Sequence, residues 1–225
     1  MSGLEGEELH AWRQYIYSVS GNNLDPSKSY LIESRLSALL EMEGCATFGE
    51  LYYRARSERG TALRRKIIDV ITVGETSFFR DGNPFTLLRN KIIPDLIDRR
   101  NRANRANPAY QTPIKIWSAA CSTGQEVYSI AITLKELLGT MSSYKIRIVG
   151  TDISDQALSR ASYGQYSKFD VERGLSETQL QRHFERTGSG WRVCDELRAM
   201  VTFQSVNLTE DFCPIGKFDI VFCRN

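Results

Sequence analysis

The sequence predicts an α/β protein: a Rossmann-like parallel sheet, preceded by an all-α helical domain and interrupted by a small antiparallel β insert. Two short runs rich in β-branched residues, Ile114–Trp117 and Lys145–Gly150, each lead through small or polar residues into a helical pattern. Residues ahead of Ile114 show only the apolar spacing of helices. Alternating strands and helices imply parallel strands with right-handed crossovers. The stretch 164–199 breaks that alternation, which indicates the insert.

The N-terminal part is expected to form a bundle of short amphipathic helices. Its first apolar stripe recurs at helical spacing and consists of Leu9, Trp12, Ile16 and Val19. Thr47 and Thr61 are placed to cap a third and a fourth helix. Helices this short are marginal alone, so their stability must come from packing against one another.

A further helix and a linker are expected before the sheet. Asn83 followed by Pro84 is a typical helix start, and Pro94 is expected to kink or end that helix. The polar, basic stretch Arg99–Pro113 then reads as a linker. Its arginines would also suit nucleic acid, but no aromatic residues interleave with them. A solvated linker without a nucleic-acid partner is therefore favoured.

Beyond the linker, strands and helices are expected in alternation. One helix is expected over Gln125–Leu138, another after an N-cap at Ser154, and a third after the S-x-x-Q capping box that Ser176 opens. A turn at Thr187–Gly190 joins the arms of a hairpin in the insert. The last apolar run, Phe218–Cys223, is expected to be a buried strand.

The composition is that of an ordinary globular protein. The 225 residues are 41% hydrophobic and 25% charged, with a formal net charge of +2. Between Leu51 and Arg105, however, 13 Lys/Arg face 6 Asp/Glu, so this region is expected either to attract an acidic partner or to form a solvated helix face. Five scattered cysteines and two histidines predict reduced thiols and no metal site. Without a signal pattern or an apolar run of ~20 residues, a cytoplasmic protein without membrane insertion is expected.

Two residues at the strand ends indicate a cofactor site. Gly124 lies in the turn after the first predicted strand, and Asp152 closes the second. Ligands of parallel sheets bind outside the carboxyl ends of the strands, where an acid can hold the hydroxyls of a ribose. The pair therefore indicates a nucleoside-containing cofactor. The turn lacks G-x-G-x-x-G, which argues against a pyrophosphate and so against a dinucleotide oxidoreductase.

Five motifs in this order resemble those of one known family. They are ETSFFRD (Glu75–Asp81), IWSAACSTGQEVYSIAI (Ile116–Ile132), GTDIS (Gly150–Ser154), VNL (Val206–Leu208) and FDIVFCRN (Phe218–Asn225). Over nearly its whole length the chain resembles the chemotaxis receptor glutamate methyltransferases, the CheR family. The resemblance implies a class I methyltransferase fold. It also implies methylation of glutamates on the cytoplasmic helices of chemoreceptors, with S-adenosylmethionine as donor and S-adenosylhomocysteine as product.

The resemblance further implies a set of cofactor-binding residues and domain boundaries. The matching positions are Thr76, Arg80, Glu126, Asp152, Asn207, Leu208, Arg224 and Asn225. Arg80 is also a candidate contact to a carboxylate of the substrate or cofactor, and no catalytic residue is assigned. The implied domains are a helical domain at 1–82, a linker helix and basic linker at 83–113, and a cofactor-binding domain at 114–225 with a β insert at about 165–200.

The implied partner is a chemoreceptor. The chain itself is expected to be a monomer. Basic residues of the N-terminal helices are the candidate contacts: Arg54, Arg56, Arg59, Arg64, Arg65 and Lys66.

Gly74 stands where many family members have an asparagine that touches the cofactor. The family continues beyond the position of Asn225 with elements that finish the sheet, so a fragment is expected. The short loop Arg186–Gly190 argues against docking of a receptor tail peptide.

The implied reaction suits these residues. A glutamate with a pKa near ~4.3 is ionised at neutral pH and needs no general base, and the sequence shows no Ser/His/Asp or Cys/His constellation. Transfer then depends on alignment and on a water-poor pocket. Phe78 and Phe79 would help to exclude water, unless they are core residues of the domain junction. A truncated or degenerate member that binds cofactor or receptor without turnover remains the alternative.

Overall fold

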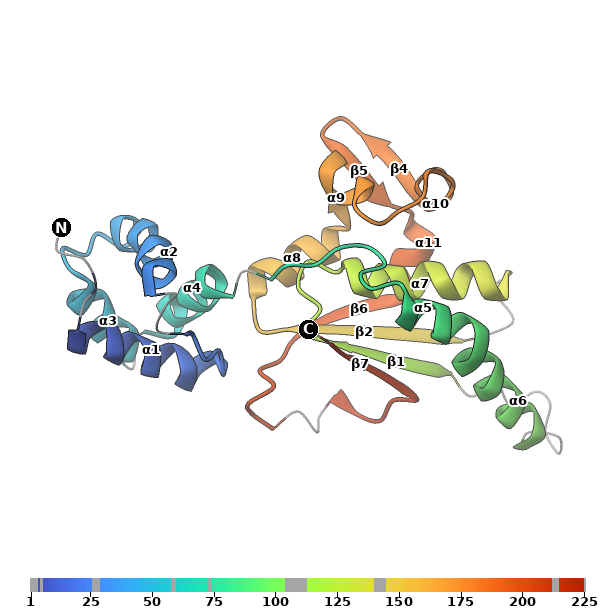
Figure 1. Ribbon diagram of the computed structural model, residues 1–225, viewed down its shortest axis with the longest axis horizontal. Helices are drawn as coiled ribbons and strands as arrows, with labels where there is room; N and C mark the ends of the chain where they lie inside the picture. Colours follow the sequence, from blue (N-terminus) through green and yellow to red (C-terminus); the bar gives the residue numbers. More distant parts are fainter. Residues whose placement is uncertain are drawn as a thin grey trace. The chain divides into compact units, whose positions relative to one another are not determined.

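The computed structural model describes residues 4, 6–25, 29–57, 60–72, 74–103, 113–139, 145–211 and 215–224 (Figure 1). The chain forms two compact units. The first comprises Met1–Gly74, Ile153–Gln156 and Ser205–Pro214, and the second comprises Glu75–Asp152, Ala157–Gln204 and Ile215–Asn225. None of the helices in the described ranges combines the length and the apolar character that crossing a membrane requires.

The first unit contains the expected bundle of short helices. Its helices are α1 (Gly6–Ser20), α2 (Ser29–Met42), α3 (Phe48–Arg56) and α4 (Thr61–Ile71). They enclose a common core in which Trp12, Leu36 and Leu51 are fully buried. Because the helices are short, this shared core supplies the stability that each lacks alone.

One of the two expected caps in the bundle is correct. Thr47 caps α3, and its hydroxyl accepts a hydrogen bond from the backbone N–H of Glu50 at 3.1 Å. The prediction for Thr61 is wrong, since Thr61 is the first residue of α4 and Gly60 occupies the N-cap position. A Cβ at Gly60 would lie 2.5 Å from the carbonyl oxygen of Arg54, so the close approach of α3 requires glycine there.

The helix before the sheet continues through Pro94. Its parts are α5 (Asn83–Leu87), a π-helical segment η3 (Leu88–Ile92) and α6 (Ile93–Ala103). Pro94 cannot donate a backbone hydrogen bond, and the wider π turn directly before it accommodates the missing donor without ending the helix. The expected linker therefore begins later than Arg99, since helix runs to Ala103; residues 104–112 lie outside the described ranges.

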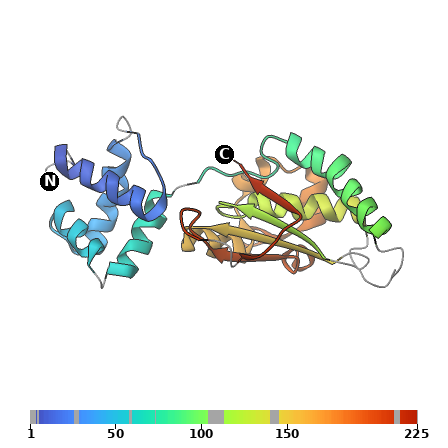
Figure 2. The ribbon, with the colours of Figure 1, turned by 90° about the horizontal axis from the view of Figure 1, so that it is seen from below.

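The second unit is built on a four-stranded sheet in the order β6-β2-β1-β7. Its strands are β1 (Ile114–Ala119), β2 (Ile146–Asp152), β6 (Val201–Ser205) and β7 (Ile220–Cys223). β1 pairs in parallel with both β2 and β7, so that Ile116 lies between Ile148 and Ile220. Helix α7 (Gln125–Leu138), expected at these bounds, packs on one face of the sheet, and Figure 2 looks onto the other. The predicted α/β fold with its all-α N-terminal part is confirmed.

The prediction of a buried final strand is wrong. Of β7, only Phe222 is buried, and Val221 is 51% exposed. Alternate strand residues point to opposite faces, so Phe222 points toward the α7 side and Val221 lies beside Trp117 on the opposite face. The apolar run of β7 indicated a strand correctly, but it did not show which face lacks cover.

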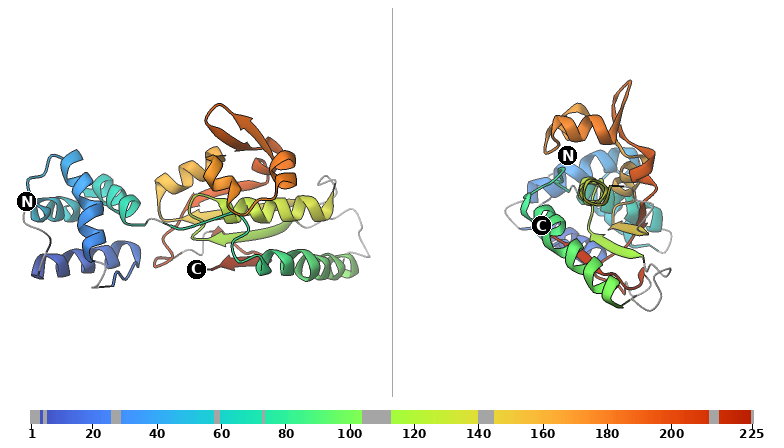
Figure 3. Two further views of the ribbon diagram at one scale, coloured as in Figure 1. Left: turned by 45° about the horizontal axis from the view of Figure 1, so that its top comes forward. Right: turned by 90° about the vertical axis from the view of Figure 1, so that its right-hand side faces the viewer.

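The insert forms a small subdomain on the side of the sheet that α7 covers (Figure 3). After α8 (Asp155–Tyr163), it contains β3 (Gln165–Tyr166), α9 (Lys168–Glu172), α10 (Glu177–His183), β4 (Phe184–Thr187), β5 (Gly190–Val193) and α11 (Asp195–Arg198). The strands form an antiparallel sheet in the order β3-β5-β4. Both α9 and α10 begin with a capping box, and the one at Ser176 was expected.

Candidate functional site

The strand order places a topological switch point beside β1. From β1 the chain moves outward through β2 to β6, and it then returns to add β7 on the other side of β1. In open α/β sheets, ligands bind outside the carboxyl ends of the strands where the order reverses in this way. The carboxyl ends of β1, β2 and β7 are therefore the candidate site.

The turn after β1 is strained and is held by the acid that ends β2. Ala120 and Ser122 have φ angles of 54° and 51°, which are rare for residues other than glycine. The Asp152 carboxylate accepts a hydrogen bond from the backbone N–H of Ser122 at 2.7 Å. Cys121 donates its backbone N–H to the carbonyl of Thr151 at 2.8 Å. Asp152, predicted from its place at the end of a strand, is only 9% exposed and joins two strand ends.

One buried tyrosine fixes the far end of this turn, and a second joins α7 to α8. Tyr166 of β3 donates its hydroxyl to the carbonyl of Thr123, and Tyr128 of α7 donates to the carbonyl of Ala161, both at 2.8 Å. Burial raises the pKa of Tyr128 to about 12 and that of Tyr166 well above its usual value. Both phenols therefore remain protonated donors over the physiological pH range.

Glu126 and Arg224 meet at the switch point. Glu126, in the first turn of α7, accepts from the Ser118 hydroxyl at 2.7 Å with one oxygen and from Arg224 Nε at 2.9 Å with the other. The Arg224 and Glu126 side chains are only 18% and 12% exposed. This partly desolvated pair joins the ends of β1 and β7.

Arg224 also holds the segment that carries Arg80. Its guanidinium donates to the carbonyl of Arg80 at 3.3 Å and to the Asp81 carboxylate at 3.2 Å. The same guanidinium lies 5.5 Å from the ring centroid of Phe85, within the range of a cation–π contact. Three of the predicted site residues, Arg80, Glu126 and Arg224, thus form one contact network.

The remaining predicted residues are described by the unit to which each belongs. Thr76 is half-buried and belongs to the same unit as Arg80. Asn207 and Leu208 belong to the first unit, where the Asn207 amide donates to the carbonyl of Val19 and to the Glu210 carboxylate, both at 3.2 Å. Asn225 lies outside the described residues.

Cys121 is a structural residue in the turn. It is 2% exposed, and burial, together with the nearby Asp152 and Glu126 carboxylates, raises the pKa of its thiol. A thiol that stays protonated is a poor nucleophile. Cys121 therefore packs as a small buried residue.

Phe78 and His183 are both buried in the second unit. Phe78 is 1% exposed and packs edge-on against Tyr166 and Phe184, so it is a core residue. His183 is 5% exposed, and its Nε2 has no hydrogen-bond partner although the Glu136 carboxylate lies 3.5 Å away. Burial lowers the pKa of His183 despite that carboxylate, which acts in the opposite direction.

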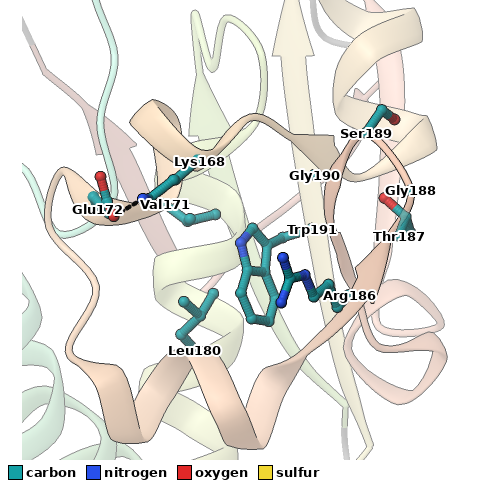
Figure 4. A pocket seen from close by; sticks show the side chains of 10 residues that line it. All are labelled: Lys168, Val171, Glu172, Leu180, Arg186, Thr187, Gly188, Ser189, Gly190 and Trp191. Carbon is teal, nitrogen blue, oxygen red and sulfur yellow. Dashed lines mark ion pairs between the residues drawn. The ribbon is translucent and has the colours of Figure 1, made fainter.

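The insert forms a half-open pocket of about 410 Å³ (Figure 4). The Trp191 indole lies across it beside Arg186, with Leu180 below (Figure 4). Lys168 and Glu172 form an ion pair at its edge, with 3.6 Å between Lys168 Nζ and Glu172 Oε1. The sequence predicted the subdomain but not this pocket.

Comparison with known proteins covers both units. Residues 74–225 match the family model "CheR methyltransferase, SAM binding domain", and residues 7–72 match "CheR methyltransferase, all-alpha domain". Chemotaxis protein methyltransferase Cher2 of Pseudomonas putida is 39% identical over 97% of this chain and 78% of its own length. Chemotaxis protein methyltransferase 1 of Pseudomonas aeruginosa is 38% identical over 97% and 77%, and the chemotaxis protein methyltransferase of Borreliella burgdorferi is 34% identical over 97% and 76%. The chain therefore belongs to the CheR methyltransferase family, whose methyl donor is S-adenosylmethionine.

Proposed function

We propose that this chain methylates glutamate side chains of chemoreceptors, forming glutamate methyl esters. The observation that supports this most directly is the position of Asp152: an acid at the carboxyl end of β2, joined to the strained turn after β1, next to the topological switch point. The relatives' names give the chemotaxis context. The resemblance of the five sequence motifs adds the glutamate substrate.

The residues at the switch point fit a sulfonium nucleoside. Asp152 would hold the ribose hydroxyls, since a carboxylate accepts two hydrogen bonds in the geometry that a diol offers. Arg80 would contact a carboxylate of the cofactor or substrate. Glu126 and Arg224, which form an ion pair with each other, would also bind the cofactor. The site would be completed by Thr76, Asn207, Leu208 and Asn225. When bound, S-adenosylmethionine supplies an electrophilic methyl group.

A glutamate substrate matches what the site provides. Its carboxylate is ionised at neutral pH and can attack the methyl carbon without a general base. The bond from glutamate oxygen to carbon forms as the bond from carbon to sulfur breaks, and both products at the reacting atoms are neutral. Charge disperses in that step, so a site poor in water favours it. Alignment of the reacting atoms is then the main task of the protein.

The basic helices of the first unit would bind the acidic face of a receptor. Arg56 of α3 and Arg64 and Arg65 of α4 are exposed to solvent. Arg59, another proposed contact, lies outside the described residues. Exposed charges of one sign accelerate association with an oppositely charged partner and make it sensitive to salt. A cytoplasmic monomer would satisfy this role.

Methyl transfer to a receptor tests the proposal. The chain is incubated with methyl-labelled S-adenosylmethionine and a purified cytoplasmic fragment of a chemoreceptor, and label released as methanol by mild base is counted. We expect base-labile label on the receptor, and none when its methylated glutamates are replaced by alanine. Binding of the cofactor without any transfer would instead favour a cofactor- or receptor-binding module.

Charge reversal tests the partner surface. We expect the double variant Arg56→Glu/Arg64→Glu to slow receptor association at low salt about tenfold and to flatten its salt dependence. S-adenosylhomocysteine should bind to this variant as to the wild type. An unchanged association rate would show that the receptor binds elsewhere.

A further inference from the structure

The turn at residues 78–82, called here the Arg80 turn, has an unfavourable backbone. Phe79 and Asp81 have φ angles of 50° and 63°, although neither is glycine. Inside the turn, the backbone N–H of Gly82 donates to the carbonyl of Phe79 at 2.9 Å. Such conformations persist only where the surrounding structure holds them. The groups that hold the Arg80 turn therefore fix the backbone from which the Arg80 side chain extends, and the Arg80 guanidinium itself donates to the carbonyl of Glu75 at 2.5 Å.

Two anchors from different elements hold this turn. Arg224 binds its C-terminal side through the carbonyl of Arg80 and the carboxylate of Asp81. Ser129, in the middle of α7, binds its N-terminal side: the backbone N–H of Phe79 donates to Ser129 Oγ at 2.9 Å. Ser129 is completely buried.

The direction of the Ser129 hydroxyl is fixed by a second hydrogen bond. Ser129 Oγ donates its proton to the carbonyl of Gln125 at 2.7 Å, one helical turn earlier. The hydroxyl therefore has to act as the acceptor toward Phe79, and its lone pair is held in place by α7. Because the site is buried, water cannot readily replace this acceptor.

We propose that Ser129 is a positioning residue of the cofactor site, which acts by fixing the left-handed backbone of Phe79 and thereby placing Arg80. This inference rests on the proposed role of Arg80 in cofactor binding. Packing supports the turn from the insert: a Cβ at Gly174 would meet the carbonyl oxygen of Phe78. The packing of Gly174 against Phe78 provides no hydrogen-bond acceptor for the Phe79 N–H, so this packing cannot replace Ser129.

Thr133 offers a matched control on the same helix. Its hydroxyl donates to the carbonyl of Ser129 at 2.8 Å, the same backbone contact that Ser129 makes with Gln125. Thr133 is 4% exposed. Ser129→Ala and Thr133→Ala therefore both remove a buried hydroxyl that bonds back along α7. Within the part of the chain that the structure describes, Ser129 also bonds to the Arg80 turn and Thr133 does not.

Calorimetric titration with S-adenosylhomocysteine is the first measurement. We expect Ser129→Ala to weaken binding about tenfold, which is about 1.4 kcal/mol, and Thr133→Ala to stay within twofold of the wild type. Ser129→Cys keeps most of the side-chain volume with a weaker acceptor, so it should lie between them, and it serves if the alanine variant does not fold. In the methyl-transfer assay, the KM for the cofactor should rise in Ser129→Ala with kcat unchanged. Simple loss of folded protein would lower kcat instead.

Amide hydrogen exchange tests the anchor itself. The Phe79 amide should exchange at least tenfold faster in Ser129→Ala than in Thr133→Ala. If the wild type binds and the two alanine variants bind alike, the inference is overturned while the proposed function stands. If the wild type does not bind S-adenosylhomocysteine at all, the proposed function fails and the inference fails with it.

Discussion

Replacing Gly124 with alanine is expected to destabilise the second unit by about 2–4 kcal/mol. Gly124 has a φ angle of 91°, and a Cβ there would lie 2.8 Å from the Cβ of Ala161 and 3.2 Å from the Tyr166 hydroxyl. A left-handed backbone costs a non-glycine residue roughly 1–2 kcal/mol, and overpacking costs roughly 1–3 kcal/mol. The lower entropy of the unfolded alanine chain offsets up to about 1 kcal/mol of this.

Urea denaturation followed by circular dichroism measures the loss. Gly188→Ala is the control, because a Cβ at Gly188 meets nothing within 4 Å, and it should change stability by less than about 0.5 kcal/mol. Ala161→Gly, combined with Gly124→Ala, removes the closest contact and should make the glycine replacement less costly by about 1–2 kcal/mol than it is in the wild-type background. A Gly124→Ala protein as stable as Gly188→Ala would refute the reasoning.

Three further changes follow from the contacts described. Burial lowers the pKa of His183, so at mildly acidic pH the folded protein binds fewer protons than the unfolded protein. The stability that is present above the unfolded pKa is therefore lost as pH falls through the folded pKa. Between pH 7 and pH 5 the melting temperature should drop less in His183→Gln than in the wild type, and an equal drop would contradict this. Arg224→Met leaves Glu126 without its cation and should cost about 2–4 kcal/mol in urea denaturation, slightly less than for a fully buried pair; a loss under about 1 kcal/mol would mean that the pair is solvated. Tyr166→Phe removes the donor to Thr123 and should cost about 1–2 kcal/mol, whereas unchanged stability would show that the turn does not depend on it.

The parallel layer of the fold could be predicted because local pattern and tertiary role agree there. Helix α7 was expected over Gln125–Leu138 and has these bounds, since Gly124 precedes its first residue and Gly139 follows its last. The box at Ser176 and the cap at Thr47 likewise use only neighbouring residues. Signals of this kind depend on a few consecutive positions, which a sequence displays directly.

Local rules fell short where other parts of the chain decide the outcome. Pro94 left both a kink and an end of its helix open, and the helix continues because the π turn before it accommodates the missing donor. Gly60, rather than Thr61, is the N-cap of α4 because α3 approaches too closely for a side chain. The exposure of Val221 depends on which side of the sheet the neighbouring helices cover.

The site was predictable in its strand-end residues but not in their supports. Asp152 ends a recognisable strand, so both the pattern and the family resemblance pointed to it. Ser129 lies within a helix and reads as an ordinary small residue, yet it binds a segment that lies 50 residues away in the sequence. The pairing of Glu126 with Arg224 spans 98 residues and is likewise invisible in either motif alone.

Titration with S-adenosylhomocysteine of the wild type, Asp152→Asn and Asp152→Ala tests the central claim most directly. Two hydrogen bonds from ribose hydroxyls to a carboxylate contribute roughly 1.5–3 kcal/mol each, so the alanine variant should bind at least about 100-fold more weakly. The asparagine variant keeps an oxygen for the Ser122 N–H and should stay folded within about 1 kcal/mol of the wild type, while still losing affinity. Wild-type affinity in both variants would contradict the account.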